Sequence, residues 1–328
     1  MNDAQSKPTS DKKSYRLILF IVIGLAAFSS IVKELRQAHA FIAELAQTVS
    51  CWSDVIVPTA SARTPMKVVT VMTRLDDSVV QPQNRSADFR WSGAVAPGQT
   101  VEIKGINGDI RAEAATGNEV HVTAKKTSRR SDVDSVQIKV VQHASGVTIC
   151  ALYPNESGDL GDCESGSDRP RNNSATVDLK NNDVRVDFIV QVPARVSFTG
   201  KTINGDVAVD GLSGNVVSKT INGSIKISTT GYAQAATING EISARLGDGN
   251  WSAPLEFKTL NGEINLELPA NVSADVDAET LNGQINSDFP ITVTTFKERK
   301  RVRGRIGVGG RELHLKTLNG SINLRVAG

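Results

Sequence analysis

The sequence predicts an all-β protein: a single-chain β-solenoid (β-helix-like) with an N-terminal transmembrane helix and a short helical stalk. Three observations predict this fold: a seven-residue motif that occurs seven times, alternating apolar residues around its copies, and one uncharged apolar segment near the N-terminus. The repeat is decisive, because a unit that cannot bury its own apolar face needs its neighbours stacked on it.

Each copy of the motif begins with a charged or small residue, and the next residue is usually Thr. Ile or Leu follows, then Asn-Gly, then a polar residue, and then Ile or Val, as in Lys219–Ile225. From Asn204 onwards, four consecutive spacings between the motif asparagines are 18, 17, 22 and 21 residues. Alternating apolar residues such as Ile264, Leu266 and Leu268 follow the copies and indicate strands. The Asn-Gly pairs are Asn107 and Gly108, Asn204 and Gly205, Asn222 and Gly223, Asn239 and Gly240, Asn261 and Gly262, Asn282 and Gly283, and Asn319 and Gly320.

Two architectures fit these Asn-Gly pairs. Both residues tolerate positive φ, so each pair turns the chain sharply, either as a two-residue hairpin in a meander or as a corner of a solenoid. We favour the solenoid, because a period near 20 residues suits one coil. Stacked coils would place Asn above Asn and let the side-chain amides form a hydrogen-bonded ladder. The last copy lies near the C-terminus, and we expect it to form the last coil.

The N-terminus has the pattern of a membrane anchor. Residues 1–14 form a polar, basic cytoplasmic tail, and residues 15–32 contain the uncharged run Leu17–Val32, which we interpret as a transmembrane helix. Basic residues before the apolar run predict export of everything after it. A cleaved signal peptide ending at the Ala38–Ala40 box is the alternative, but the charged residues between the apolar run and that box favour an uncleaved anchor.

Residues 33–52 predict an amphipathic helix. Apolar residues recur at steps of four and three from Ile31 to Trp52, which is a heptad pattern. The pattern indicates either self-association through residues 31–52 or a helix that lies on the bilayer or on the domain. Residues 53–87 are rich in Pro, Ser, Thr and Ala, so we interpret them as a linker before the repeat domain at residues 88–328.

The first part of the repeat domain contains a candidate disulfide. Strand-like alternation is found around residues 120–124, 136–140, 147–151 and 183–192. Cys150 and Cys163 enclose a loop rich in Gly, Asp and Asn. Because the domain is predicted to lie outside the cytoplasm, we expect these two cysteines to pair.

A basic segment separates the last two motif copies, which are 37 residues apart. It is a candidate contact for anionic lipid headgroups or other envelope polyanions. The alternative is a solvated hairpin or an edge strand whose charges prevent strand addition. The candidate residues are Lys297, Arg299, Lys300, Arg301, Arg303 and Arg305.

The composition offers little support for catalysis. A net charge of +2 provides no general attraction for nucleic acid, the four histidines lack zinc-ligand spacing, and no phosphate-binding loop occurs, so we expect no cofactor, metal or nucleic-acid partner. The best enzymatic case is Glu241 and Glu263, which share a motif position in neighbouring copies, so stacking would bring them to about the 5 Å of a retaining glycosidase. Other copies have Ser224 or Gln284 there, which indicates an ordinary polar position.

The motif copies resemble the repeats of the DUF4097-type family of bacterial exported β-solenoids, which are described as candidate adhesins. The resemblance covers residues 88–328 and implies a β-helix-like fold in the cell envelope, without catalytic residues. The matching segments are Lys201–Val207 and Lys258–Ile264, Trp91–Gly93 before the first copy, Val147–Cys150 with Tyr153–Pro154, and Gly304–Gly310.

We therefore expect a non-catalytic envelope protein, anchored in the membrane, with its solenoid in the periplasm or at the cell surface. The solenoid would bind a glycan or an envelope protein through a long polar surface. The alternatives are a polysaccharide-cleaving β-helix enzyme that uses stacked carboxylates and a membrane-linked component of signalling or envelope stress.

Overall fold

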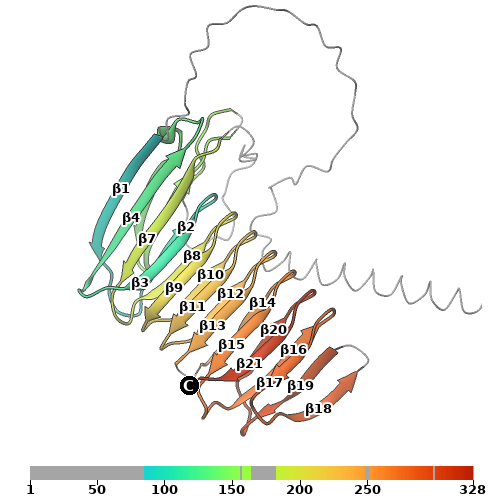
Figure 1. The fold of residues 1–328 in the computed structure, drawn as a ribbon. Helices are drawn as coiled ribbons and strands as arrows, with labels where there is room; N and C mark the ends of the chain where they lie inside the picture. The colour runs from blue at the N-terminus through green and yellow to red at the C-terminus, as the bar shows by residue number, and fades with distance from the viewer. Residues whose placement is uncertain (1–84, 156, 164–181, 248–250, 298–299, 328) are drawn as a thin grey trace, which may run out of the picture. The chain divides into compact units, whose positions relative to one another are not determined.

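The computed structural model describes residues 85–155, 157–163, 182–247, 251–297 and 300–327 (Figure 1). The predicted tail, anchor and amphipathic helix, and almost all of the linker, lie outside the described residues. Within the described ranges, no helix has the length and apolarity needed to cross a bilayer. The first strand begins at Arg85, slightly before the predicted start of the domain at residue 88, because residues 85–87 continue its antiparallel pairing.

The described chain is all-β and forms two large sheets, with one short 3-10 helix at Val133–Ser135. In spatial order, sheet A consists of β1 (Arg85–Ala94), β4 (Glu119–Ser128), β7 (Arg185–Val192), β3 (Ile110–Ala114), β9 (Val207–Leu212), β11 (Ile225–Thr229), β13 (Ile242–Leu246), β15 (Ile264–Leu268), β21 (Ile322–Val326) and β17 (Ile285–Ser287). Sheet B consists of β18 (Thr292–Lys297), β19 (Lys300–Ile306), β16 (Ala274–Thr280), β20 (Glu312–Lys316), β14 (Leu255–Lys258), β12 (Ala233–Ala236), β10 (Val216–Lys219), β8 (Ser197–Lys201), β2 (Thr100–Lys104), β6 (Gly146–Leu152) and β5 (Gln137–His143).

Each motif copy joins a strand of sheet B to a strand of sheet A. For example, β10 leads through Asn222 and Gly223 into β11, and the chain then returns to sheet B as β12. Strands of successive coils pair in parallel, and equivalent residues face each other, such as Ile225 and Ile242. The motif copies therefore form the corners of a β-solenoid-like stack, as predicted, and the alternative of Asn-Gly hairpins is wrong for them.

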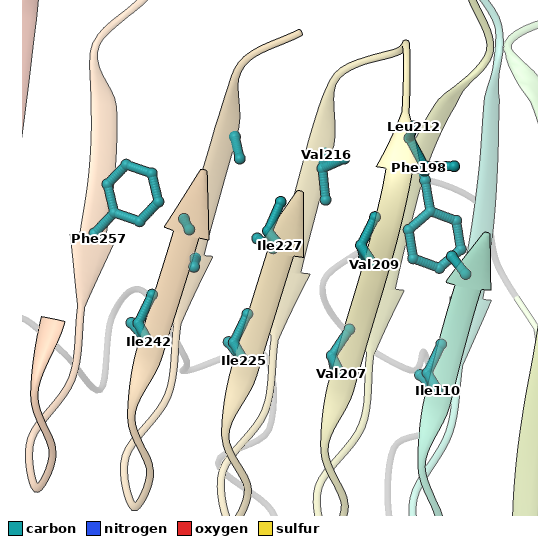
Figure 2. Packing of buried hydrophobic residues seen from close by; sticks show 14 of the residues in the cluster. Ile110, Phe198, Val207, Val209, Leu212, Val216, Ile225, Ile227, Ile242 and Phe257 are labelled. Atoms are coloured by element: carbon teal, nitrogen blue, oxygen red, sulfur yellow. The ribbon is translucent and has the colours of Figure 1, made fainter. Parts of the chain in front are cut away.

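The core lies between the two sheets and is built from rows of equivalent aliphatic residues. Figure 2 shows Val207, Ile225 and Ile242 at matching positions of β9, β11 and β13, all buried. In sheet B, a Cβ atom on Gly200 would lie 3.0 Å from Cε1 of Phe198, so the ring occupies the space that the glycine leaves. The core contains few aromatic residues, and small residues such as Gly200 leave the space that these large side chains fill.

The motif glycines have a second use beyond the predicted tolerance of positive φ, which Gly108 shows with a φ of 137°. Among the described residues other than glycine, only Arg195 has a positive φ, so the motif asparagines do not adopt a left-handed conformation. A Cβ atom on Gly223 would instead lie 2.0 Å from the carbonyl oxygen of Gly205 in the neighbouring coil. A Cβ atom on Gly240 would likewise lie 2.0 Å from the carbonyl oxygen of Gly223, and one on Gly262 would lie 1.9 Å from that of Gly240. The glycines thus permit close approach between coils.

The motif threonines use these same carbonyl groups. The hydroxyl of Thr220 donates to the carbonyl of Gly205, and that of Thr237 donates to the carbonyl of Gly223, both at 2.9 Å. These threonines are buried, so the hydrogen bond satisfies a hydroxyl that would otherwise be costly to bury. The first copy has Gly105 in place of Thr, and the β6–β7 unit that stacks next to it has no Asn-Gly motif.

The coils do not stack in sequence order. Parallel bridges join Asn261 to Asn319, and Asn319 to Asn282, so the last copy in the sequence lies between the two copies that precede it. The expectation that it forms the last coil is therefore wrong. After β17 the chain forms the antiparallel hairpin β18–β19 against β16, and it then returns to insert β20 and β21 into the stack (Figure 1). Because the copies share the same Asn-Gly corner, the corner of one copy can stack on that of a copy that is not next to it in the sequence.

We expect Gly240→Ala to lower the free energy of unfolding by roughly 1–3 kcal/mol, because the added methyl group overlaps a backbone carbonyl and forces the coils apart. Gly117→Ala is the matched control, since a Cβ atom there would meet nothing within 4 Å. The midpoint of urea unfolding measures both effects. Equal midpoints for the two variants would contradict the close-approach explanation.

Candidate binding surface

A ladder of asparagine side chains runs along the edge where the motifs turn. From Asn222 onwards, each motif Nδ2 donates to the Oδ1 of a neighbouring motif asparagine, which confirms the predicted stacking. The bonds run from Asn222 to Asn204, Asn239 to Asn222, Asn261 to Asn239 and Asn282 to Asn319 at 2.8 Å, and from Asn319 to Asn261 at 2.7 Å. All of these donors are exposed, so the ladder forms a regular polar edge.

The first coil is fixed by contacts outside the ladder. Asn107 donates from Nδ2 to the carbonyl of Val184 at 3.1 Å, and the hydroxyl of Tyr153 donates to that carbonyl at 3.0 Å. Burial raises the pKa of Tyr153 above its usual value. A disulfide joins Cys150 and Cys163, the predicted pair, with their Cα atoms 5.7 Å apart. Strand β6 and the loop after it are therefore tied to the first coil.

The polar residue after each motif glycine has a structural use in several copies. Oδ1 of Asp109 accepts from the backbone nitrogen of Asp206 at 2.9 Å, and Oδ1 of Asp206 accepts from that of Ser224 at 2.8 Å. At this position Glu241 accepts from Asn265 at 2.7 Å, and both Glu241 and Glu263 are exposed. The pair thus lies on an open edge. Across the described ranges, no three His, Cys, Asp or Glu side chains are grouped to hold a metal ion.

Five lysines occupy aligned outward positions of sheet B, which we call the lysine row, although Lys201 and Lys258 are buried among their neighbours. They stand directly before the motif threonine or its equivalent, on the last residue of their strands. The parallel register aligns Lys104 with Lys201 and Lys201 with Lys219, then Ala236, and then Lys258 with Lys316. Neighbouring positions in such a row are about 4.8 Å apart. Repulsion between like charges at this spacing must be offset by nearby acids.

Two glutamates in the adjacent outward row provide part of that compensation. Oε1 of Glu102 lies 3.0 Å from Nζ of Lys201, and its Oε2 lies 3.6 Å from Nζ of Lys104. The hydroxyl of Thr148 also donates to Glu102 at 3.0 Å. Glu256 lies 3.0 Å from Nζ of Lys258. These contacts pair Lys104, Lys201 and Lys258 with carboxylates, and the side chains of Lys201 and Lys258 are buried.

A shallow depression of about 70 Å³ interrupts the lysine row at β12. It exists because Ala236 occupies the position at which the neighbouring coils carry Lys219 and Lys258. Val217 and Ala236 contribute apolar atoms, while Gln234 and Glu256 contribute polar groups. The depression therefore combines a small apolar floor with charged sides.

The basic hairpin predicted to contact polyanions is largely engaged within the protein. Asp277 of β16 accepts hydrogen bonds from Arg301 and from Arg303, the latter at 3.0 Å, and Nε of Arg305 lies 3.3 Å from Asp275. Burial raises the pKa of Asp277, but the two arginines outweigh it and hold that pKa below its usual value. Lys300 is exposed at the start of β19. Arg299 and the side chain of Lys297 lie outside the described residues.

Sequence reasoning missed the lysine row, although its signal was present. Five of the seven motif copies have Lys at the first position, and the other two have Ala236 and Glu279. The parallel register shows that these residues lie side by side on one face. The depression at Ala236 follows from the same alignment, because one short side chain interrupts a row of long ones.

The family model described as Toastrack DUF4097 matches residues 53–325 of this chain. The chain belongs to this family. No curated protein matches it. Two solved structures are similar to this Toastrack chain. A candidate cell adhesion protein from Clostridium sporogenes ATCC 15579 is 12% identical, with a TM-score of 0.37, over 74% of this chain and 100% of its own. A candidate adhesin from Bacteroides fragilis NCTC 9343 is 11% identical, with a TM-score of 0.32, over 76% of this chain and 100% of its own.

We expect Asp277→Asn to destabilise the Toastrack domain at neutral pH by about 1 kcal/mol, because it removes the charge that faces Arg301 and Arg303. The pKa of Asp277 is lowered by folding, so this stabilisation is present above the unfolded pKa, about 3.9, and is lost as pH falls through the folded value. Urea midpoints of wild type and variant should therefore converge in acid. The exposed Asp288→Asn is the control, and a constant difference across the pH range would contradict the assignment.

Proposed function

We propose that this protein is a non-catalytic binding protein of the bacterial cell envelope, which presents its β-solenoid-like surface to a glycan or to a partner protein. The observation that carries the proposal is the exposed row of asparagine side chains, which repeats one polar group at each step along the edge of the stack. A surface with a fixed repeat along one direction suits an extended ligand that repeats in the same direction.

The motif positions near the best enzymatic candidates support binding rather than catalysis. Glu241 is hydrogen-bonded to Asn265 on an exposed strand face, and Asp206 uses its carboxylate to accept a neighbouring backbone N–H. A glycosidase holds its paired carboxylic acids around a bound sugar, whereas these groups stand on an open edge.

We further propose that residues 15–32 anchor the protein in the membrane and that residues 33–52 form a helix before the linker at 53–87. The disulfide between Cys150 and Cys163 supports a repeat domain outside the reducing cytoplasm. Self-association through residues 31–52 belongs to the same proposal. Protease is added to cells whose outer layers have been removed but whose inner membrane is unbroken, and it should digest the repeat domain. Complete protection of the domain would refute this placement.

The full-length protein should bind members of an array of neutral and acidic glycans and cell-wall fragments without converting them. Product analysis of each bound glycan distinguishes binding from turnover. Turnover that is lost in Glu241→Gln or Glu263→Gln would replace this proposal with the enzyme. Binding only to an envelope protein, with every glycan negative, would restrict the proposal to a protein partner.

A further inference from the structure

We propose that the free edge of β1 is the docking site for a segment of the same chain, Val68–Met72, which adds to sheet A as a further strand. The inference goes beyond the proposed function, because it concerns how the repeat domain holds its own N-terminal linker. It rests on the backbone edge of β1, on two half-buried aromatic residues of that strand, and on the sequence just before it.

Strand β1 forms one edge of sheet A (Figure 1). It has 10 residues, and in the described part of the chain it pairs only with β4. This antiparallel register continues from Arg85 to Ala94 without a bulge. Because the backbone groups of an edge strand can pair on one side only, the groups that face away from β4 are left for another strand. A long, regular edge of this kind is a template for strand addition.

The other three sheet edges are less suited to strand addition. Strand β17 has 3 residues, and β18 has two irregularities in its register with the arginine-rich β19. The disulfide loop lies against β5, since Sγ of Cys163 is 3.8 Å from the carbonyl oxygen of Lys139 and Asp162 pairs with the ammonium group of that lysine at 3.1 Å. Short strands, bulges and covering loops are the usual protection of sheet edges, whereas β1 is long and regular.

The inward side chains of β1 leave the core incomplete at this edge. The register aligns Trp91 with Val122 of β4 and Phe89 with Ala124, and both of these β4 residues are buried. Trp91 and Phe89 pack against the same core but are only half-buried, because no strand follows β1 in the described sheet. A further strand would remove part of both rings from water, which is favourable for large aromatic side chains.

The segment before β1 has the composition of a strand that could fill this place. Val68–Met72 reads Val-Val-Thr-Val-Met, and four of its five residues are β-branched, which favours a strand. Lys67 and Arg74 lie close on either side, as charged residues often do around apolar strands. The segment lies outside the described residues, but the family match begins at residue 53 and therefore includes it in the Toastrack domain.

The connection to β1 permits this pairing. Residues 73–84 link Met72 to Arg85, and the entropic cost of closing such a loop grows only slowly with its length. Pro82 lies near the end of the connection and cannot donate a backbone hydrogen bond, so it favours a loop at this point. A segment of the same chain is favoured over a second copy, because its effective concentration at β1 does not depend on the protein concentration.

Hydrogen exchange of the full-length protein in detergent, measured by mass spectrometry of its peptides, tests the inference. We expect the amides of residues 68–72 to exchange roughly tenfold or more slowly than those of residues 59–64 in the same linker. In the double variant Val69→Pro with Thr70→Pro, β1 should exchange faster than in the wild type. Adjacent N–H groups point to opposite sides of a strand, so one of the two prolines removes a hydrogen bond to β1 whatever the register.

The matched control is Ala60→Pro combined with Ser61→Pro. It places two prolines in the same linker but outside the docking segment, so the exchange of β1 should stay at the wild-type rate. Slow exchange of β15 in sheet A verifies that the domain is folded in each variant.

Three outcomes would overturn the inference: unprotected amides at residues 68–72 in the wild type, equal exchange of β1 in the two double variants, or protection of β1 that is lost on roughly tenfold dilution. The last result would assign the edge to a second copy of the chain. Each of these outcomes leaves the proposed binding function intact, because the glycan array tests that function separately.

Discussion

The structure depends on how closely successive coils approach at their Asn-Gly corners. The carbonyl of one motif glycine lies where the Cβ atom of the next would be, as between Gly205 and Gly223. The same carbonyl accepts a buried threonine hydroxyl, from Thr220 in this case. Steric exclusion and hydrogen bonding thus act on a single atom, and together they hold the corners in register. The asparagine ladder reinforces this register on the exposed side.

Strict register at the corners has a consequence for the surface. Residues at equal distances from the corner lie side by side in both sheets, whether they face the core or the solvent. Inside, this produces rows such as Val207, Ile225 and Ile242, which bury one continuous apolar strip. Outside, it produces the lysine row. The same geometry that stabilises the stack therefore repeats any outward side chain at the strand spacing.

Three of the four sheet edges of the described stack end in antiparallel strands, and only sheet A ends on a parallel strand, β17. At one end β4 pairs with β7 and β1 pairs with β4, and at the other end the hairpin β18–β19 covers β16 in sheet B. Such caps protect the backbone groups of the last parallel strands from pairing with other chains. The arginines of β19 are matched to the acids of β16, so the cap is also held by charge.

The sequence by itself determined the repeating unit: the all-β class, the corner at each Asn-Gly, the asparagine ladder and the pairing of Cys150 with Cys163 all follow from local chemistry. Only the tertiary structure decided which copies are neighbours, because nearly identical surfaces leave the order of coils open until the β18–β19 hairpin sends the chain back between Asn261 and Asn282. It also added a second reason for the glycines besides positive φ, since a Cβ atom there would clash with a carbonyl from another coil. The lysine row belongs to the same class of property: its residues are evident in the sequence, but their common face exists only once the coils are stacked in register.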